Sequence, residues 1–311
     1  MPDQNKAEKL FHEYFIEWVE LYKVDAVKKI TLNKYFTTHK WLKTNASELK
    51  MCELNRATYQ KLINLYAKEH AKLTTKNFHA QLKSSIIDAL EDGVIEKNPT
   101  KKVVIKGQAV ESSKVKFLNQ EELKKLIDQL DLCDITSWDW IIFIGIKTGL
   151  RFSEIIALTP NDFDFENCLI NVDKTWNYKE QNGGFQDTKN ASSIRKVQID
   201  EVFALKIKKQ LLDFGKSELI FLKNRSRIFN STVNDRLNSL CLRAGIPVIT
   251  MHALRHTHAS LLIFSGVSIA TVSKRLGHST ISTTQETYLH IIKEMEMADR
   301  EKITNLLKIL S

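Results

Sequence analysis

The dipeptide Asn98-Pro99 divides this 311-residue chain into two parts, each of which we expect to fold around its own core. Proline has no backbone N–H and disfavours a helical conformation in the residue before it, so regular structure ends there. The stretch KKVVIKGQAVESSKVK follows, and it is basic and poor in large core residues. These signals predict three segments: a helical domain over residues 1–100, a basic linker over 101–116, and a second domain over 117–311.

The first segment shows helical periodicity throughout. In LFHEYFIEWVELYK one face carries four apolar residues, Leu10, Tyr14, Trp18 and Leu21. KLINLYAKEHAKL repeats this spacing. A further helix is predicted in TTKNFHAQLKSSIIDALEDGVI, starting at Thr74 or Thr75 and ending near Gly93. The sequence therefore predicts an all-α domain before the linker.

The second segment is helical but contains one β-rich stretch. Asn119 and Glu122 have the spacing of a capping box at its first helix. Further on, CLINVDKTW and SIRKVQI show the alternation of strands, and the NGG at 182–184 marks a turn between them. The predicted fold class is mainly α with a small antiparallel β-sheet in the second domain, that is, α+β.

Cysteine usage and hydropathy narrow the protein class. The four cysteines lie far apart and form no C-x-x-C pair, which argues against a zinc site and a disulfide framework. The longest apolar run, around residues 140–146, is too short to span a membrane. The N-terminus lacks the basic-then-apolar pattern of a signal peptide. We therefore expect a cytoplasmic protein with no membrane partner.

The net charge of +9 is concentrated in one region. Residues 21–110 carry 17 Lys and Arg against 8 Asp and Glu, whereas residues 111–311 carry 27 against 24. One interpretation is a solvated basic surface. The other is a domain that binds a polyanion such as DNA, because cations that displace condensed counterions drive DNA affinity. On this second interpretation Lys76, Gln81 and Lys83 are the candidate DNA contacts, on a predicted recognition helix.

Four polar clusters stand out in the second domain: TGLRFSE, DTKNASSIRKV, HALRHTHAS and LGHSTISTTQETYLHI. Each has an ordinary explanation when taken alone. Arg151 and Glu154 have the spacing of an ion pair on one helix face, and Lys189 has the position of a solvated lysine on a hairpin. His252 and Arg255 share a helix face, and a histidine on a helix is more often a satisfied structural group than a catalyst.

Together the clusters supply the groups that phosphoryl transfer needs without a metal. Guanidinium groups hold phosphate oxygens and neutralise the charge of the transition state. A tyrosine hydroxyl, here that of Tyr288, is a covalent nucleophile. Histidine and lysine move protons to and from the bridging oxygens. The chain contains no G-x-x-x-x-G-K-[ST] motif, so nucleotide hydrolysis is not indicated, and no cofactor or metal is expected.

In this order the motifs resemble those of the tyrosine recombinase (phage integrase) family. The resemblance extends from about Leu10 to the C-terminus, and LFHEYFIEWVELYK is similar to the core-DNA-binding domain of that family. The long hairpin WNYKEQNGGFQDTKNASSIRKV is more similar to the integrases of phages and conjugative transposons than to Xer-type recombinases. The resemblance implies that residues 117–311 are the catalytic domain with a C-terminal tail.

The resemblance also implies a role for each motif residue. Arg151 and Arg255 would clamp the scissile phosphate, and Tyr288 would attack it to leave a 3′-phosphotyrosyl link and a free 5′-hydroxyl. Lys189 would protonate the 5′ oxygen, although Lys196 lies near it and is a rival for this role.

The remaining implied roles belong to neighbouring side chains. His252 would assist proton transfer, His278 would hydrogen-bond the phosphate, and Glu154 would orient Arg151. His256 and His258 we interpret as structural, although His256 lies four residues after His252 and helical spacing does not exclude it from the site. Neither ATP nor a metal is required, because the tyrosyl link conserves the phosphodiester energy.

The implied partners are double-stranded DNA attachment or core sites, a homotetramer on two duplexes, and accessory DNA-bending or directionality factors. Both domains would close around the duplex as a C-shaped clamp. An apolar stripe in the tail, Ile303, Leu306, Leu307 and Leu310, would dock on a neighbouring protomer, or else pack within its own chain.

Other function classes stay open at this point. They are an Xer-type resolution recombinase, a type IB topoisomerase-like strand transferase and a DNA-binding repressor without enzymatic activity. Larger integrases often carry an N-terminal domain for arm sites, whereas the core-binding pattern here begins near Leu10. Either the protein uses core sites alone or the sequence is part of a longer chain.

Overall fold

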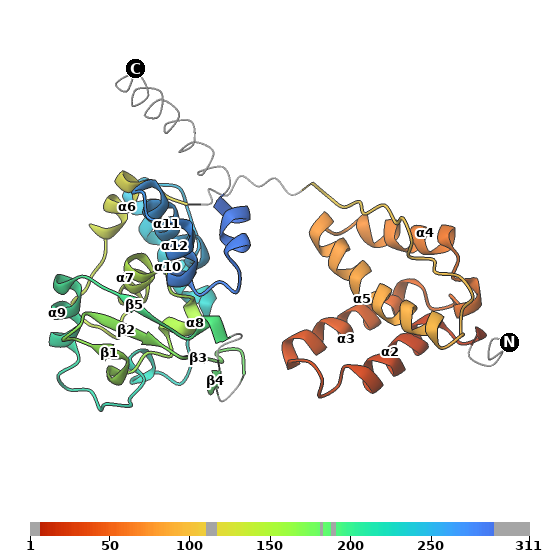
Figure 1. Cartoon of the computed structure of the whole chain (residues 1–311), viewed down its shortest axis with the longest axis horizontal. Coiled ribbons are helices and arrows are strands. Elements are labelled where there is room, and N and C mark those ends of the chain that lie inside the picture. The colour runs from red at the N-terminus through yellow and green to blue at the C-terminus, as the bar shows by residue number, and fades with distance from the viewer. Residues whose placement is uncertain (1–6, 110–116, 181–182, 188–190, 289–311) are drawn as a thin grey trace, which may run out of the picture. The chain divides into compact units, whose positions relative to one another are not determined.

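The computed structural model describes residues 7–109, 117–180, 183–187 and 191–288. The chain divides into two compact units, Met1–Ser112 and Ser113–Ser311 (Figure 1). Lys189 and the apolar stripe of the tail, Ile303 to Leu310, lie outside the described residues. The predictions that concern them are therefore not tested.

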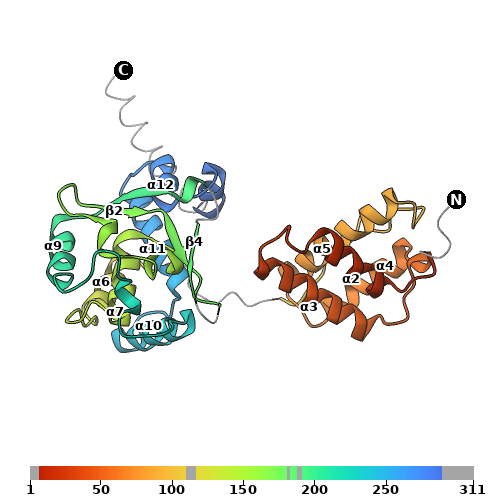
Figure 2. The ribbon, with the colours of Figure 1, turned by 90° about the horizontal axis from the view of Figure 1, so that it is seen from below.

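The first unit is all helical in its described part. Its helices are α2 (Phe11–Tyr22), α3 (Lys29–Asn45), α4 (Arg56–Ala67) and α5 (Lys72–Glu91), with a short 3-10 turn at Met51–Glu53. Figures 1 and 2 show these helices packed around one another, and a single cluster of buried apolar side chains lies between them.

The buried face of α2 differs from the predicted one. Phe11, Phe15, Trp18 and Val19 are buried, whereas Leu21 is 74% exposed. The helix carries two overlapping apolar stripes, and the stripe with two phenylalanines removes more apolar area from water. The prediction of a helix was right, and the choice of Leu21 for its inner face was wrong.

Helix α5 begins earlier than predicted. Its first residue is Lys72, and Ala71 at the N-cap position provides no side-chain cap. Thr75, one of the two predicted start residues, is buried inside the helix, where its hydroxyl donates to the Ala71 carbonyl at 3.2 Å. The predicted end was close, because the helix stops at Glu91 and Gly93 follows with a positive φ.

Residues 101–109, the first part of the predicted linker, belong to the first unit and lie against its helical part. The Gln60 side chain donates to the Val104 carbonyl and accepts from the Val104 N–H, both at 2.9 Å. Further along, the Gln108 N–H donates to the His70 carbonyl at 2.9 Å. Because these bonds satisfy backbone groups, this segment is packed rather than free.

The second unit contains more helices and two small sheets. Its helices are α6 (Gln120–Ile127), α7 (Trp138–Thr148), α8 (Phe152–Ile155), α9 (Glu201–Gln210), α10 (Asn230–Ala244), α11 (Met251–Phe264) and α12 (Ile269–Leu276), and residues 281–288 are also helical. Figure 2 shows α6, α7 and α10 gathered on one side of this unit, where α10 packs against both α6 and α7. The predicted capping box is confirmed, since Asn119 and Glu122 exchange side-chain to backbone bonds at 2.8 and 2.9 Å.

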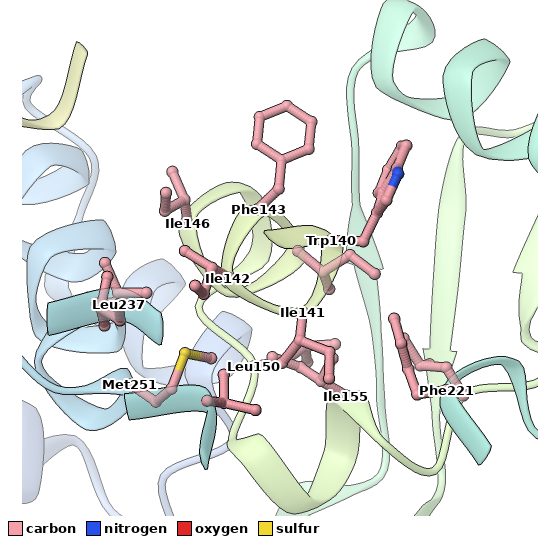
Figure 3. Packing of buried hydrophobic residues seen from close by; sticks show 14 of the residues in the cluster. Trp140, Ile141, Ile142, Phe143, Ile146, Leu150, Ile155, Phe221, Leu237 and Met251 are labelled. Atoms are coloured by element: carbon pink, nitrogen blue, oxygen red, sulfur yellow. The ribbon is translucent and has the colours of Figure 1, made fainter. Parts of the chain in front are cut away.

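Helix α7 forms the centre of the core. Trp140, Ile141, Ile142 and Ile146 on it are buried, and Figure 3 shows them surrounded by apolar side chains from α8, α10 and α11. A helix that is apolar on every side is stable in water only when neighbours cover it fully. None of the helices in the described parts of the chain is both long and apolar enough to span a lipid bilayer.

The strands form two separate antiparallel sheets instead of the single one predicted. β1 (Phe163–Asp164), β2 (Leu169–Val172) and β5 (Arg195–Gln198) pair in the order β1-β2-β5, while β3 (Lys174–Trp176) and β4 (Phe185–Asp187) form a hairpin. The sequence signals did not include β1, which has only two residues. The predicted fold class, mainly α with small antiparallel sheets, is confirmed.

Candidate active site

A buried carboxylate organises the site. Glu154 on α8 accepts the Arg151 backbone N–H at 2.8 Å and an Arg151 guanidinium N–H at 2.8 Å. Arg195 on β5 donates to both oxygens of the same carboxylate, at 3.1 and 2.9 Å. Burial raises the pKa of Glu154, but the hydrogen bond and charge of Arg195, followed by Arg151, outweigh burial and lower it. Glu154 is therefore an anion that fixes two guanidinium groups.

Arg195 is a site residue that the sequence motifs did not predict. It is 8% exposed and shares the inner face of β5 with Val197. Its guanidinium also donates to the carbonyls of Arg275 at 2.7 Å and Ser193 at 2.9 Å. A charged residue in register with the apolar residues of a strand was the available signal, because buried charges need partners.

Main-chain carbonyls position the other arginines. Arg255 on α11 is 4% exposed and donates to the carbonyls of Gly149 at 2.8 Å and Leu276 at 2.6 Å. Arg151 donates to the carbonyl of Gly277 at 3.1 Å. Burial, followed by the charge of Arg151, lowers the pKa of Arg255 to about 9, so the group stays charged at neutral pH.

Two glycines shape the loops that provide these carbonyls. Gly149 ends α7 with φ +69°, and Gly277 ends α12 with φ +68°. A Cβ atom would lie 2.7 Å from the His258 ring at the first position and 3.0 Å from the Arg195 guanidinium at the second. Both the left-handed backbone and the lack of space favour glycine, so these turns bring Arg151 and His278 to the arginine cluster.

The two predicted site histidines lie beside the arginines. His278 Nδ1 lies 2.7 Å from the hydroxyl of the buried Thr284, and burial, followed by Arg255 and Arg151, lowers the pKa of His278 to about 4. His252 lies near the start of α11, and burial, followed by the same two arginines, lowers its pKa as well. Both rings are therefore neutral at pH 7, and each can donate or accept one proton.

The predicted nucleophile Tyr288 is 2% exposed. Its ring belongs to a small apolar cluster with Ala259, Ile263, Val272 and Leu276. Burial raises the pKa of Tyr288 to about 12, although the charge of Arg255 acts in the opposite direction.

The Tyr288 hydroxyl shares a hydrogen bond of 2.9 Å with His256 Nδ1. His256 was predicted to be structural, and this contact links it directly to the candidate nucleophile. His258 lies elsewhere, with Nδ1 at 2.9 Å from the Ile146 carbonyl and Nε2 accepting from Arg275 at 2.9 Å.

The helix that carries Tyr288 begins at Ile281. Residues 281–288 are helical, and Thr280 Oγ1 accepts the Thr283 N–H at 3.4 Å. Ser282, Thr283 and Thr284 therefore lie inside the helix. Thr280 provides the cap because it is the first residue whose hydroxyl reaches an unpaired N–H of the first turn.

The candidate DNA contacts on α5 fall into two groups. Lys76 and Lys83 are exposed and seven residues apart, so they share one face of the helix. Gln81 is half-buried, and its side-chain oxygen accepts from the Thr38 hydroxyl at 2.5 Å. Gln81 therefore already holds α3 against α5.

Within the described ranges, no three His, Cys, Asp or Glu side chains are placed to hold a metal ion. Lys196, the rival of Lys189, is exposed on β5. The arrangement consists of three clustered arginines with one carboxylate among them, two neutral histidines and a phenol. Such a cationic site can bind a phosphodiester and present a nucleophile to it.

Comparison with known proteins identifies related sequences. The sequence profile of the phage integrase family matches residues 116–295. The integrase of Staphylococcus phage L54a is 26% identical over 95% of this chain and 93% of its own length. The transposase from transposon Tn916 of Enterococcus faecalis is 28% identical to this chain. The matched region spans 75% of this chain and 62% of the transposase.

Solved structures share the fold. The Tn1549 transposon integrase in complex with transposon right end DNA aligns with a TM-score of 0.78, over 95% of this chain and all of that chain, at 19% identity. A lambda integrase dimer bound to a COC′ core site aligns with a TM-score of 0.65, over 88% of this chain and 94% of that chain, at 16% identity.

Proposed function

The chain belongs to the phage integrase family, as its motifs predicted, and we propose that it is a site-specific DNA recombinase that integrates and excises a mobile element. The convergence of Arg151, Arg255 and Arg195 around one carboxylate, with Tyr288 nearby, is the observation that carries this proposal. Relatives from a phage and from a conjugative transposon support the mobile-element role.

Arg151 and Arg255 bind the non-bridging oxygens of the scissile phosphate in this proposal. Each guanidinium has five N–H donors, and carbonyls or Glu154 engage only some of them. Arg195 contacts Glu154 and not the phosphate, so it positions the carboxylate that orients Arg151. Rigid, buried donors stabilise transition-state charge strongly because they need no reorganisation.

Tyr288 then attacks the phosphorus. A bond forms between the phenolic oxygen and phosphorus, and the bond between phosphorus and the 5′ oxygen breaks. The 5′ oxygen takes a proton from Lys189 or from Lys196 if the hairpin places that residue instead. The product is a 3′-phosphotyrosyl link, which the 5′-hydroxyl of a partner strand reverses to exchange strands.

The histidines assist this step. If Thr284 donates its hydroxyl proton to His278 Nδ1, then Nε2 carries the ring hydrogen and donates it to a phosphate oxygen. His252, which is more exposed, exchanges protons with the reacting strand. Because both pKa values are lowered, each ring enters the reaction neutral.

The first unit binds the duplex next to the cleavage point, with Lys76 and Lys83 on phosphates. A homotetramer on two duplexes carries out the exchange, and accessory DNA-bending or directionality factors set its direction. The Tn1549 and lambda integrase structures, which hold DNA, support a DNA partner for this chain.

An Xer-type role is the second candidate. The recombinase XerA of Saccharolobus solfataricus is 32% identical over 59% of this chain, which covers 55% of XerA. The two roles differ in their DNA: an integrase joins two different attachment sites, whereas a resolving recombinase acts on two copies of one site. Recombination assays with each pair of sites separate them.

The proposal is tested with DNA that the protein itself selects. Genomic duplex is enriched on Tyr288→Phe protein and sequenced, and a nicked version of the recovered site is mixed with wild-type protein in EDTA. We expect a denaturant-resistant adduct at a 3′ phosphate, and none with Tyr288→Phe, which lacks only one oxygen. An adduct that persists in the variant, or one that requires a divalent metal, contradicts the proposed chemistry.

A further inference from the structure

We propose that His256 is a catalytic residue that holds the Tyr288 hydroxyl and accepts its proton as the hydroxyl attacks phosphorus. The inference rests on the proposed function, in which Tyr288 is the nucleophile. It assigns a role to a histidine that lies outside the motif roles given above.

The geometry places a base directly on the reacting atom. His256 Nδ1 lies 2.9 Å from the Tyr288 oxygen, which is within reach of direct proton transfer. The two rings are 5.8 Å apart at 61°, so the contact is made through the edge of the imidazole and not by stacking. His256 lies on α11 one residue after Arg255, and the phosphate clamp and the base therefore share one rigid helix.

The surroundings of Tyr288 make such a base necessary. The hydroxyl is nearly inaccessible to solvent, and its ring packs against Ile263, Val272 and Leu276. Water in contact with the hydroxyl is therefore scarce, and burial disfavours the phenolate. Loss of the proton to a neighbouring imidazole avoids a free phenolate in an apolar pocket.

Proton balance follows from the two ring nitrogens. For Nδ1 to accept a proton, it must be unprotonated, and Nε2 must carry the ring hydrogen of the neutral imidazole. As the bond between the Tyr288 oxygen and phosphorus forms, its proton moves to Nδ1 and His256 becomes an imidazolium. The 5′ oxygen leaves with a proton from the general acid. In the reverse step the imidazolium returns its proton to Tyr288.

Titratable and charged groups in the described structure face or adjoin this histidine. His252 lies one turn earlier on α11, with its ring 4.7 Å from that of His256 at 85°. His278 interacts electrostatically with His256 from the segment after α12, and Tyr288 faces it from the helix at 281–288. Arg255 is its neighbour in the chain. The proton that His256 accepts therefore enters a cationic site, which a bound phosphate makes favourable.

The test measures the rate of adduct formation on two forms of the recovered duplex. One has the natural 5′ oxygen at the cleavage point, and the other has a 5′ bridging sulfur, a leaving group that needs no proton. His256→Asn keeps an acceptor near the Nδ1 position but accepts no proton at neutral pH, whereas His256→Ala removes both functions. His39→Asn, on α3 of the first unit, is the matched histidine control.

We expect both His256 variants to form adduct roughly 100-fold or more slowly than wild type on both duplexes. Their rate should rise about tenfold per pH unit, because it then follows the phenolate fraction, whereas the wild-type rate should rise less steeply because a general base takes the proton. A merely structural role would lower the rate without this change in the profile. His39→Asn should match wild type.

Several outcomes overturn the inference. Wild-type rates in His256→Asn would show that the histidine positions the hydroxyl without taking its proton, and wild-type or faster rates in His256→Ala would exclude both roles. Rescue by the sulfur duplex would assign His256 to the leaving group. These results differ from failure of the proposed function, in which wild-type protein itself gives no Tyr288-dependent adduct.

Discussion

The two units differ in where they keep their charge. Among the described residues, no Asp, Glu, Lys or Arg of the first unit is buried, although its segment 21–110 holds the basic excess. The second unit buries five such residues, Asp139, Glu154, Asp162, Arg195 and Arg255. Surface charges act on a partner and leave the fold unaffected, whereas buried paired charges are part of the fold. Chemistry and stability are therefore coupled in the second unit and separable in the first.

The two units also differ in the contacts that hold their cores together. The first unit relies on aromatic contacts, and Tyr66 stacks between His70 and Phe78 with ring centroids 3.8 Å apart on each side. In the second unit, ion pairs also join elements of the core, as where Arg236 on α10 makes two bonds of 2.7 Å to Asp139 on α7. Substitutions that remove charge are therefore expected to act differently in the two units.

The largest expected effect is that of Glu154→Gln. The change leaves Arg151 and Arg195 without their shared carboxylate, and removing one partner of a buried ion pair costs about 3–5 kcal/mol of unfolding free energy. Adduct formation should also be lost. Denaturant titration measures the first effect.

Glu121→Gln is the matched control for this prediction. Glu121 pairs with Lys125 on the exposed surface of α6, so its loss should leave the unfolding free energy nearly unchanged. Equal stabilities of the two variants would remove the distinction between buried and surface charge in this unit.

A smaller loss of folding stability is expected at acid pH. The pKa of His258 falls to about 4 in the fold, chiefly through burial, while an ordinary histidine titrates near 6.5. The unfolded chain therefore takes up the proton first. Stability from this group is complete above pH 6.5 and declines by up to about 3 kcal/mol as pH falls towards 4. Thermal melts of His258→Gln should show a shallower decline over this window than wild type, and an unchanged slope would contradict the assignment.

Gln81→Ala probes the first unit at a polar contact. The substitution removes the acceptor of the Thr38 hydroxyl, and the expected loss of stability is about 1 kcal/mol. If DNA affinity falls more than stability does, the side chain also contacts the duplex. Filter binding and denaturant titration on the same preparation separate the two effects.

The smallest effect on stability is expected from Lys76→Gln and Lys83→Gln. Both side chains are exposed, so unfolding free energy should change by less than about 0.5 kcal/mol. The slope of log affinity against log salt should fall by about one for each lost phosphate contact. Lys125→Gln changes the net charge equally and serves as the control. Unchanged slopes would show that this face of α5 does not contact DNA phosphates.

Local signals in the sequence predicted much of this molecule. The Asn119–Glu122 capping box and the end of α5 near Gly93 depend on residues close to one another in the chain, and both were predicted. The motifs also predicted that Arg151 and Arg255 meet, because their family resemblance fixes a common site.

Long-range contacts were not predicted. Arg195 lies 41 residues from Glu154, and His256 lies 32 residues from Tyr288, so no local spacing connects either pair. The face of α2 was misassigned for a similar reason: two stripes fit the helical period, and packing against other helices decided between them. The sequence could not show which of several possible side chains contact one another, because only folding brings distant residues together.

The carbonyls that hold Arg151 and Arg255 have a consequence for how such a site evolves. Every amino acid has a main-chain carbonyl, so the positions that receive these guanidinium groups, 149, 276 and 277, contribute no distinctive side chain to the contact. Selection there acts on the path of the backbone. Two descendants can diverge widely around the site and keep the same arginine orientation, provided that both loops retain their left-handed turns. If the arginine side chains alone were transferred to another scaffold, they would lack the main-chain carbonyls that orient them here.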